Sequence, residues 1–190
     1  DLLKYTAAPY IYNSKSNFNT KSLLADYMTR CTNEKDKKMM ERLAKSVMQL
    51  EPGTKLPKVY VINSENRTLE LSSIVTKPTI IYFWSYQKKS HFKDSHRKMY
   101  ELKSKYPDLN FIAINVNNDR HDIWKRSLKQ YNFPIEHEYQ FIEPSTARKD
   151  LVINSINKVM IIDGNGVIAD PNANMFSTRF EELLLGLLNK

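Results

Sequence analysis

The chain has 190 residues, of which 41 % are hydrophobic and 26 % charged. This length and composition suit one globular domain with a small appendage, and they exclude two large domains or a chain that is disordered throughout. Lysine and arginine number 29 against 21 aspartates and glutamates, giving a net charge of +8. Acidic residues are interleaved with the basic ones almost throughout, so we interpret the excess as a solvated basic surface.

The first predicted elements are helical. We expect residues 1–18 to form an irregular or docked arm, because they show no clear period. A helix that Ser22 or Thr20 can cap follows, and Asn33 is expected to cap a second helix whose apolar side chains recur three and four residues apart. The Pro52–Gly53 pair ends that helix. We therefore predict an N-terminal arm and helical extension over residues 1–50.

After this break the pattern becomes rich in β-formers and alternates with helices. The predicted strands cover residues 58–63, 68–71, 79–84, 110–116, 158–162 and 167–169, and the predicted helices cover 90–106, 119–131 and a closing segment that Ser177 can cap. Strand 79–84 (TIIYFW) is continuously apolar, as is typical of a central strand buried on both faces. This order predicts an α/β domain with a mixed sheet over residues 51–190.

Five strings in this part of the chain, in this order, resemble the thioredoxin-like superfamily, in its TlpA-like and alkyl hydroperoxide reductase–thiol-specific antioxidant branch. They are LEPGTKLP (50–57), LELSS (69–73), KPTIIYFWS (77–85), FIAINV (111–116) and VMIIDGNGVI (159–168). The resemblance covers about residues 50–190. It implies a thioredoxin-like mixed β-sheet flanked by helices, here with an N-terminal helical extension.

The residues that carry the chemistry of this family are replaced. In the family, a Cys-x-x-Cys motif follows the central strand, and the helix N-terminus lowers the pKa of the first thiol. Ungapped alignment puts Lys88 and His91 at the two cysteine positions, and no cysteine occurs from residue 32 to 190. The family's cis-proline corresponds to Asn157, where we expect a trans bond because a non-proline cis bond costs about 3–4 kcal/mol. The resemblance thus implies a degenerate redox site.

Aromatic and basic residues surround these positions, so we expect the ancestral substrate groove to remain as a binding surface. The candidate binding residues are Trp84, Tyr86, Lys88, Lys89, Ser90, His91 and Asn157. Cations at a helix N-terminus oppose its dipole, but free N–H groups combined with basic side chains suit an anion. The expected partner is an unidentified protein, or an acidic peptide or anion. Lys88 and Asn157 are expected to lie close together in space.

The sequence thus predicts a redox-inactive thioredoxin-like (TlpA-like) domain with a binding or structural role, a degenerate relative of thiol-disulfide oxidoreductases. The alternative is an atypical one-Cys thiol oxidoreductase or peroxidase that uses Cys31, the single cysteine. A third possibility is a basic nucleic-acid-binding module, which scattered charge and the absence of a stacking aromatic motif disfavour. We expect no cofactor and no metal site, since His91 and His96 lie about 140° apart around a helix.

Two further expectations concern the ends of elements and of the chain. We interpret Asp119–Asp122 (DRHD) as N-terminal capping of helix 119–131. The chain begins at Asp1 and not at Met, so we interpret it as a processed or truncated form that has lost any signal peptide or lipid anchor. The resemblance implies a location in the bacterial periplasm or cell envelope.

Overall fold

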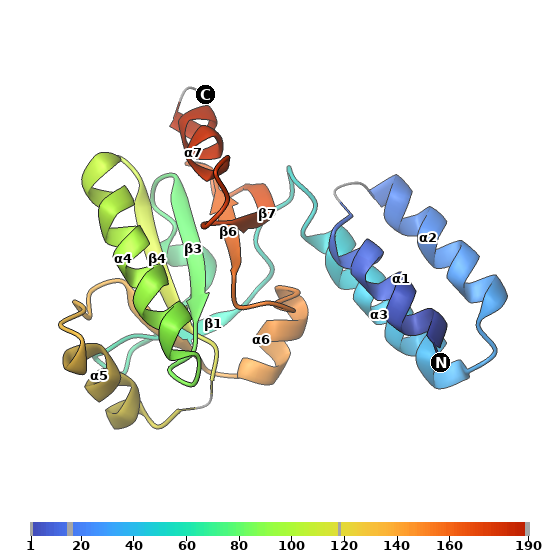
Figure 1. The fold of residues 1–190 in the computed structure, drawn as a ribbon, viewed down its shortest axis with the longest axis horizontal. Helices are drawn as coiled ribbons and strands as arrows, with labels where there is room; N and C mark the ends of the chain where they lie inside the picture. The colour runs from blue at the N-terminus through green and yellow to red at the C-terminus, as the bar shows by residue number, and fades with distance from the viewer. Residues whose placement is uncertain (1, 15–16, 118, 189–190) are drawn as a thin grey trace.

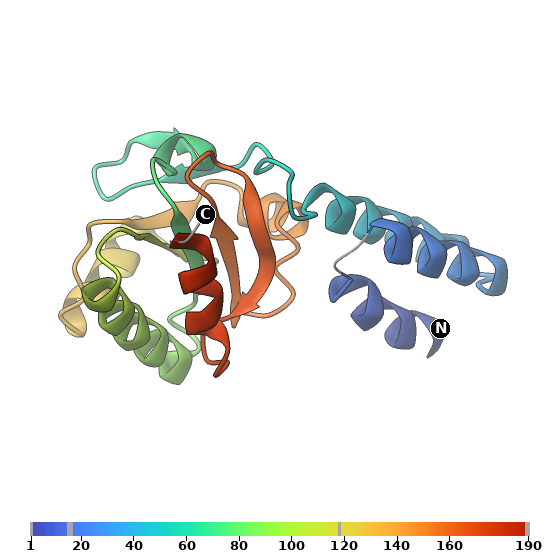
Figure 2. The ribbon, with the colours of Figure 1, turned by 90° about the horizontal axis from the view of Figure 1, so that it is seen from above.

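The computed structural model describes residues 2–14, 17–117 and 119–188, and in it three helices precede an α/β domain (Figure 1). The helices are α1 (Leu2–Tyr12), α2 (Asn17–Arg30) and α3 (Glu34–Gln49). They pack against one another around a small core made of Ile11, Tyr27, Cys31, Met40 and Ala44. Figure 2 shows them projecting together from one side of the domain.

The N-terminal helices confirm one prediction and correct two others. The side-chain oxygen of Asn33 accepts the N–H groups of Lys35 and Asp36, so Asn33 caps α3 as predicted. Of the irregular or docked arm expected over residues 1–18, the irregular form is wrong over α1, a helix whose Leu3, Ala7 and Ile11 pack against the neighbouring helices. Helix α2 begins before both Thr20 and Ser22, which lie inside the helix and do not cap it.

The domain is built on a seven-stranded mixed sheet. Its strands are β1 (Tyr60–Ile62), β2 (Thr68–Glu70), β3 (Thr79–Trp84), β4 (Asn110–Asn115), β5 (Glu138–Phe141), β6 (Lys158–Ile162) and β7 (Ile168–Asn174), in the order β2-β1-β5-β4-β3-β6-β7. Strands β3, β4 and β5 are parallel, and the other pairings are antiparallel. The predicted α/β class with a mixed sheet is confirmed.

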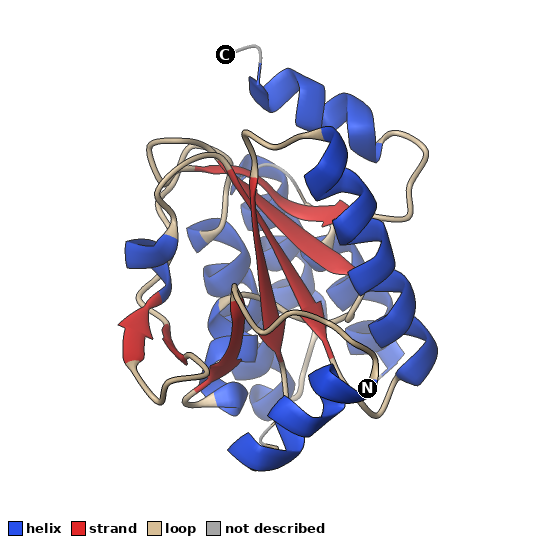
Figure 3. Ribbon diagram, turned by 90° about the vertical axis from the view of Figure 1, so that its left-hand side faces the viewer, coloured by secondary structure: helices blue, strands red, loops and turns tan. Residues whose placement is uncertain are grey.

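Helices cover both faces of this sheet, as Figure 3 shows. They are the short 3₁₀ helix η1 (Leu71–Ile74), α4 (Lys89–Lys105), α5 (His121–Gln130), α6 (Pro144–Asp150) and α7 (Phe180–Leu188). Successive strand residues point to opposite faces. Tyr82 and Trp84 of β3 therefore pack with α4, α5 and α7, whereas Ile81 and Phe83 pack with α6. Strand β3 is buried on both sides, as its apolar pattern predicts.

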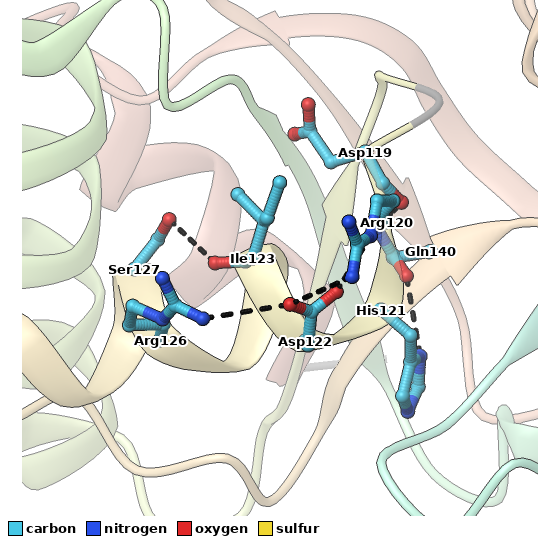
Figure 4. A network of polar contacts seen from close by, with 8 residues as sticks. All are labelled: Asp119, Arg120, His121, Asp122, Ile123, Arg126, Ser127 and Gln140. Carbon is cyan, nitrogen blue, oxygen red and sulfur yellow. Dashed lines mark hydrogen bonds and ion pairs between the residues drawn. The ribbon is translucent and has the colours of Figure 1, made fainter.

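The start of α5 corrects the capping interpretation of the DRHD segment. The N-cap residue is Arg120, and no side chain caps the helix. Figure 4 shows Asp119 pointing away from α5, and its carboxylate accepts the side-chain amide of Asn117 at 3.3 Å. Asp122 lies in the first turn, between Arg120 at 3.1 Å and Arg126 at 3.5 Å. Asp119 thus stabilises the loop before α5, and Asp122 pairs with two arginines. Neither acid caps the helix.

The helical extension joins the domain through the C-terminal end of α3. Leu50, the C-cap residue, is buried in the domain core, and Leu43 and Val47 pack against the same core. The N–H of Gly53 donates to the carbonyl of Ile168 at 2.9 Å, with a φ of 94° that favours glycine. Helix α6, which the sequence analysis does not predict, contacts α3. Within the described residues, no helix is long and apolar enough to cross a membrane.

Candidate functional site

The loop from β3 into α4 holds the positions that align with the family's cysteines. Lys88 is the N-cap of α4, and no side chain caps this helix. Lys88, Lys89 and Ser90 are exposed, and the first turn carries no acidic residue. The helix therefore presents its free N–H groups and two ammonium groups on one surface, as an anion site requires.

His91 lies in the first turn of α4 and is half-buried. Both ring nitrogens are buried and have no hydrogen-bond partner within the described residues. The ring packs edge-on against Phe176, with their centroids 6.0 Å apart. Burial lowers the pKa of His91, and the neighbouring His96 lowers it further. His91 is therefore neutral at pH 7, so it contributes no positive charge to the surface.

Tyr86 and Lys89 form a connected pair beside this turn. The Tyr86 hydroxyl donates to the side-chain oxygen of Gln130 at 2.8 Å, and the ring packs edge-on against Phe92. The Lys89 ammonium lies 5.7 Å from the centroid of the Tyr86 ring. This cation–π contact positions Lys89, whereas Lys88 makes no ion pair within the described residues.

Trp84 does not belong to this surface, so its place among the candidate binding residues is wrong. Its side chain is 0 % exposed, because it points from β3 into the layer under α4. The indole Nε1–H donates to Oε2 of Glu138 at 2.9 Å. Trp84 is thus a core residue with a satisfied polar atom, and no ligand outside the domain reaches it.

A buried histidine–glutamate pair, which the sequence analysis does not predict, lies beneath α4. His96 is 1 % exposed and Glu138 is 4 % exposed. Nδ1 of His96 lies 2.7 Å from the carbonyl oxygen of Phe92, and Nε2 lies 2.9 Å from Oε1 of Glu138. A carbonyl only accepts, so Nδ1 carries a proton, and a second proton lies between Nε2 and Oε1. The pair joins α4 to β5 and is enclosed by the core.

The spacing of residues in the sequence indicates that His96 points inward. Phe92, His96 and Met99 are spaced four and three residues apart, which places them on one helix face, and all three are buried. The partner, Glu138, lies 42 residues away along the chain. The helical period thus identifies the histidine as buried, but it does not identify the carboxylate.

Asn157 lies at the same end of the sheet as the start of α4. Tyr82 of β3 pairs with Val159 of β6 in antiparallel register. The pairing ends there, and Asn157 lies in the turn that immediately precedes β6. Asn157 is exposed, and its bond is trans as expected, since the described residues include no cis peptide bond. The closeness of Lys88 and Asn157 stays a prediction.

Ser85 connects two loops at this edge of the sheet. Its hydroxyl oxygen accepts the backbone N–H of Gln87 at 3.3 Å and the side-chain amide of Asn117 at 2.7 Å. The loop that leads to α4 is thereby fixed to the loop that follows β4. Both loops reach one end of a large cleft, of about 1330 Å³, that lies between α3 and α6.

Cys31 lies in the helical extension and not at this site. It is 3 % exposed, within the core of the three N-terminal helices. Its Sγ lies 3.6 Å from the carbonyl oxygen of Asn33. A reactive cysteine needs an accessible thiolate, and this burial opposes one. The described residues also contain no group of three or more side chains that could hold a metal ion.

Comparisons with known proteins agree with this geometry. Residues 76–168 match the family model described as thioredoxin-like. The C-terminal domain of a protein from Bacteroides thetaiotaomicron, assigned as a thiol-disulfide oxidoreductase, superposes with a TM-score of 0.61 at 19 % identity, covering 74 % of this chain and 98 % of that domain. The chain contains a domain with the thioredoxin-like fold.

Other solved thioredoxin-like structures match equally well. A protein from Bacteroides vulgatus, also assigned as a thiol-disulfide oxidoreductase, has a TM-score of 0.63 at 17 % identity, covering 73 % of this chain and 98 % of its own. A thiol:disulfide interchange protein assigned as DsbE, from Chlorobium tepidum, has a TM-score of 0.59 at 19 % identity with the same coverage. No curated protein matches the sequence. The thioredoxin-like domain thus shares its fold with proteins assigned to thiol-disulfide exchange.

Proposed function

We propose that this chain is a redox-inactive, TlpA-like domain that acts by binding another molecule and not by thiol-disulfide exchange. The observation that carries the proposal is the presence of Lys88 and His91 at the start of α4, with no cysteine between residues 32 and 190. Disulfide exchange proceeds through a thiolate that forms a mixed disulfide. Neither an ammonium group nor a neutral imidazole forms that bond.

The proposed binding surface is the exposed start of α4 with Asn157. Lys88 and Lys89 supply positive charge, and the free N–H groups of the first turn supply hydrogen-bond donors. The half-buried Tyr86 and His91 add aromatic surface next to them. This combination suits a carboxylate-bearing ligand, such as an acidic peptide of a partner protein.

We also propose a location in the bacterial periplasm or cell envelope. The support is the fold shared with bacterial proteins, one of which is assigned as a thiol:disulfide interchange protein. Fractionation of the source cells, with this chain detected by antibody, is the measurement that checks it. Recovery with cytoplasmic markers alone would contradict this location.

The absence of redox activity is tested by comparing the protein with its Cys31→Ser variant. We expect both to reduce insulin disulfides and to consume peroxide only at the rate of a protein-free control. The reason is that the single thiol, Cys31, is buried in the helical extension. A turnover that disappears in Cys31→Ser would instead establish the one-Cys oxidoreductase or peroxidase.

The binding surface is tested with the Lys88→Glu/Lys89→Glu variant. Titration of the wild type with sulfate, phosphate and short acidic peptides should shift the backbone amide NMR signals of residues 86–92, and the variant should show no such shifts. The glutamate at position 88 should also raise the thermal midpoint slightly, because an acid at a helix N-terminus gains about 0.3–1 kcal/mol. Unchanged signals over residues 86–92 in the wild type would show that the surface at the start of α4 binds none of these ligands, and would contradict the proposal.

A further inference from the structure

The cleft between α3 and α6 is a large hollow of the described surface. Its volume of about 1330 Å³ exceeds the 300–1,000 Å³ that is usual for small-molecule pockets. One wall is α3, the other is α6 with the segment that follows it, and Gln87 and Asn117 close one end. Lys88 and the other exposed residues at the start of α4 do not line it, so the cleft is a separate surface.

Both walls of the cleft carry unpaired cations. Helix α3 contributes Lys35, Lys38 and Arg42, and α6 contributes Arg148 and Lys149. All five side chains are exposed, and none makes an ion pair within the described residues. The three on α3 are spaced three and four residues apart, which places them on one face. Five cations from two separate helices therefore line one cleft.

The carboxylates that line the cleft already form ion pairs or hydrogen bonds with other side chains. Asp36 accepts the ammonium of Lys4 at 3.1 Å. Glu34 accepts the ammonium of Lys37 at 2.8 Å. The carboxylate of Asp119 accepts side-chain amides, among them that of Asn115 at 3.2 Å. The residues that line the cleft thus keep an excess of positive charge, because six cations stand against three carboxylates.

The cleft also has an apolar strip between its cations. Met39, which is 40 % exposed, and Leu43 contribute it from α3. Val152 and Ile153, in the segment after α6, also line the cleft but are buried, at 7 % and 5 % exposed. An inorganic anion or a phosphate backbone would leave Met39 and Leu43 in water. A peptide that carries both carboxylates and apolar side chains would cover the strip and neutralise the cations.

We infer that the cleft between α3 and α6 binds an acidic segment of a partner protein, in which apolar side chains alternate with carboxylates. The stripe from Lys35 to Arg42 is about 10 Å long on a helix, which is the length of about three residues of an extended peptide. The segment would enter with its carboxylates toward the two basic walls and its apolar side chains toward Met39 and Leu43. This inference does not depend on whether the start of α4 binds a ligand.

The test uses a fluorescent ten-residue peptide of alternating glutamate and leucine, with terminal glycines for solubility. Its titration should shift backbone amide NMR signals of residues 35–46 and 144–153. The Arg42→Glu/Arg148→Glu variant should bind it at least tenfold more weakly. The matched control is Lys45→Glu/Lys129→Glu, which changes the net charge equally at two exposed lysines outside the cleft and should change the affinity less than twofold.

Three results would overturn the inference. The first is equal weakening in the two double variants, which would show unspecific charge attraction. The second is equally tight binding of a ten-residue polyglutamate or a single-stranded DNA, which would identify a general polyanion site. The third is the absence of shifts in the cleft at millimolar peptide. Circular dichroism of each variant, with Arg42→Gln/Arg148→Gln as a milder substitute, separates lost binding from lost folding.

Discussion

Lys158, at the start of β6, is a buried lysine that holds the segment between α6 and β6. It is 4 % exposed, and its Nζ donates to the carbonyl oxygens of Leu151 at 2.6 Å and Val152 at 3.2 Å. Val152 has a φ of 48°, a left-handed conformation that β-branched residues rarely adopt. The amino group of Lys158 thus ties a strained turn to the start of β6.

The buried position of Lys158 predicts a pH dependence of stability. Burial lowers its pKa from 10.5 to about 7, and the nearby Asp170 only partly opposes this shift. Between these values the unfolded chain binds the proton more strongly than the folded chain. The stability contributed by Lys158 is therefore fully present above pH 10.5 and is lost as the pH falls toward about 7. Below about pH 7 it no longer changes with pH.

The measurement is urea unfolding of the wild type and of Lys158→Met between pH 6 and pH 10. The free energy of unfolding of the wild type, relative to the variant, should rise above pH 7 by an amount on the order of a few kcal/mol. Lys129→Met, at an exposed lysine, should show no such rise. A constant difference between wild type and Lys158→Met over the whole range would contradict the prediction.

At the scale of elements, α7 is held to α4 by a polar cluster at its first turn. Glu181 accepts hydrogen bonds from Lys105, from the Tyr106 hydroxyl at 3.0 Å and from Lys98 at 3.5 Å. Apolar side chains of α7, with Phe180 first among them, pack into the same core as α4. The cluster therefore fixes the angle at which the last helix lies on the sheet.

Glu181 predicts that this attachment weakens in acid. Its hydrogen bond from Lys105, followed by that from Tyr106, lowers its pKa from 4.5 to about 2. A carboxyl group with a lowered folded pKa contributes stability above its unfolded value, and loses it as the pH falls toward the folded value. Glu181→Gln should be less stable than the wild type at pH 7, and the difference should shrink between pH 4.5 and about pH 2.

Urea unfolding at pH 7 and near pH 2.5 checks this, with Glu182→Gln as the matched control in the same turn. Glu182 is exposed, and its ion pair with Arg179 is 3.6 Å long, so its removal should have a small effect. Equal effects of the two substitutions at both pH values would mean that the cluster around Glu181 does not stabilise α7.

At the scale of the whole molecule, the features that local patterns determine could be predicted from the sequence. The cap at Asn33 needs only a side chain and two neighbouring N–H groups, and the buried strand β3 needs only its apolar run. The mixed sheet follows from the order of such elements. The absence of cysteine from residues 32 to 190 is also visible in the sequence, because it depends on composition alone.

The features that depend on distant contacts could not be predicted. Helix α1 is stabilised by packing against α2 and α3, and Pro9 in its interior masks its pattern. Helix α6 has seven residues, too few for a clear period. The apolar run of β3 indicates that Trp84 is buried. Its position at the end of the strand also fits a residue at the edge of a binding groove, so the sequence alone does not decide between the two. The two walls of the cleft come from segments about a hundred residues apart.

The attachment of α3 over its last two turns has a mechanical consequence for the cleft. Leu43, Val47 and Leu50 are held against the domain core, while the start of α3 lies far from the domain (Figure 2). A rotation of about 10° around Leu43 would displace Lys35 by about 2 Å, given a rise of 1.5 Å per residue. A small change in the angle of the helix would therefore change the width of the cleft at its open end and adjust it to peptides of different bulk.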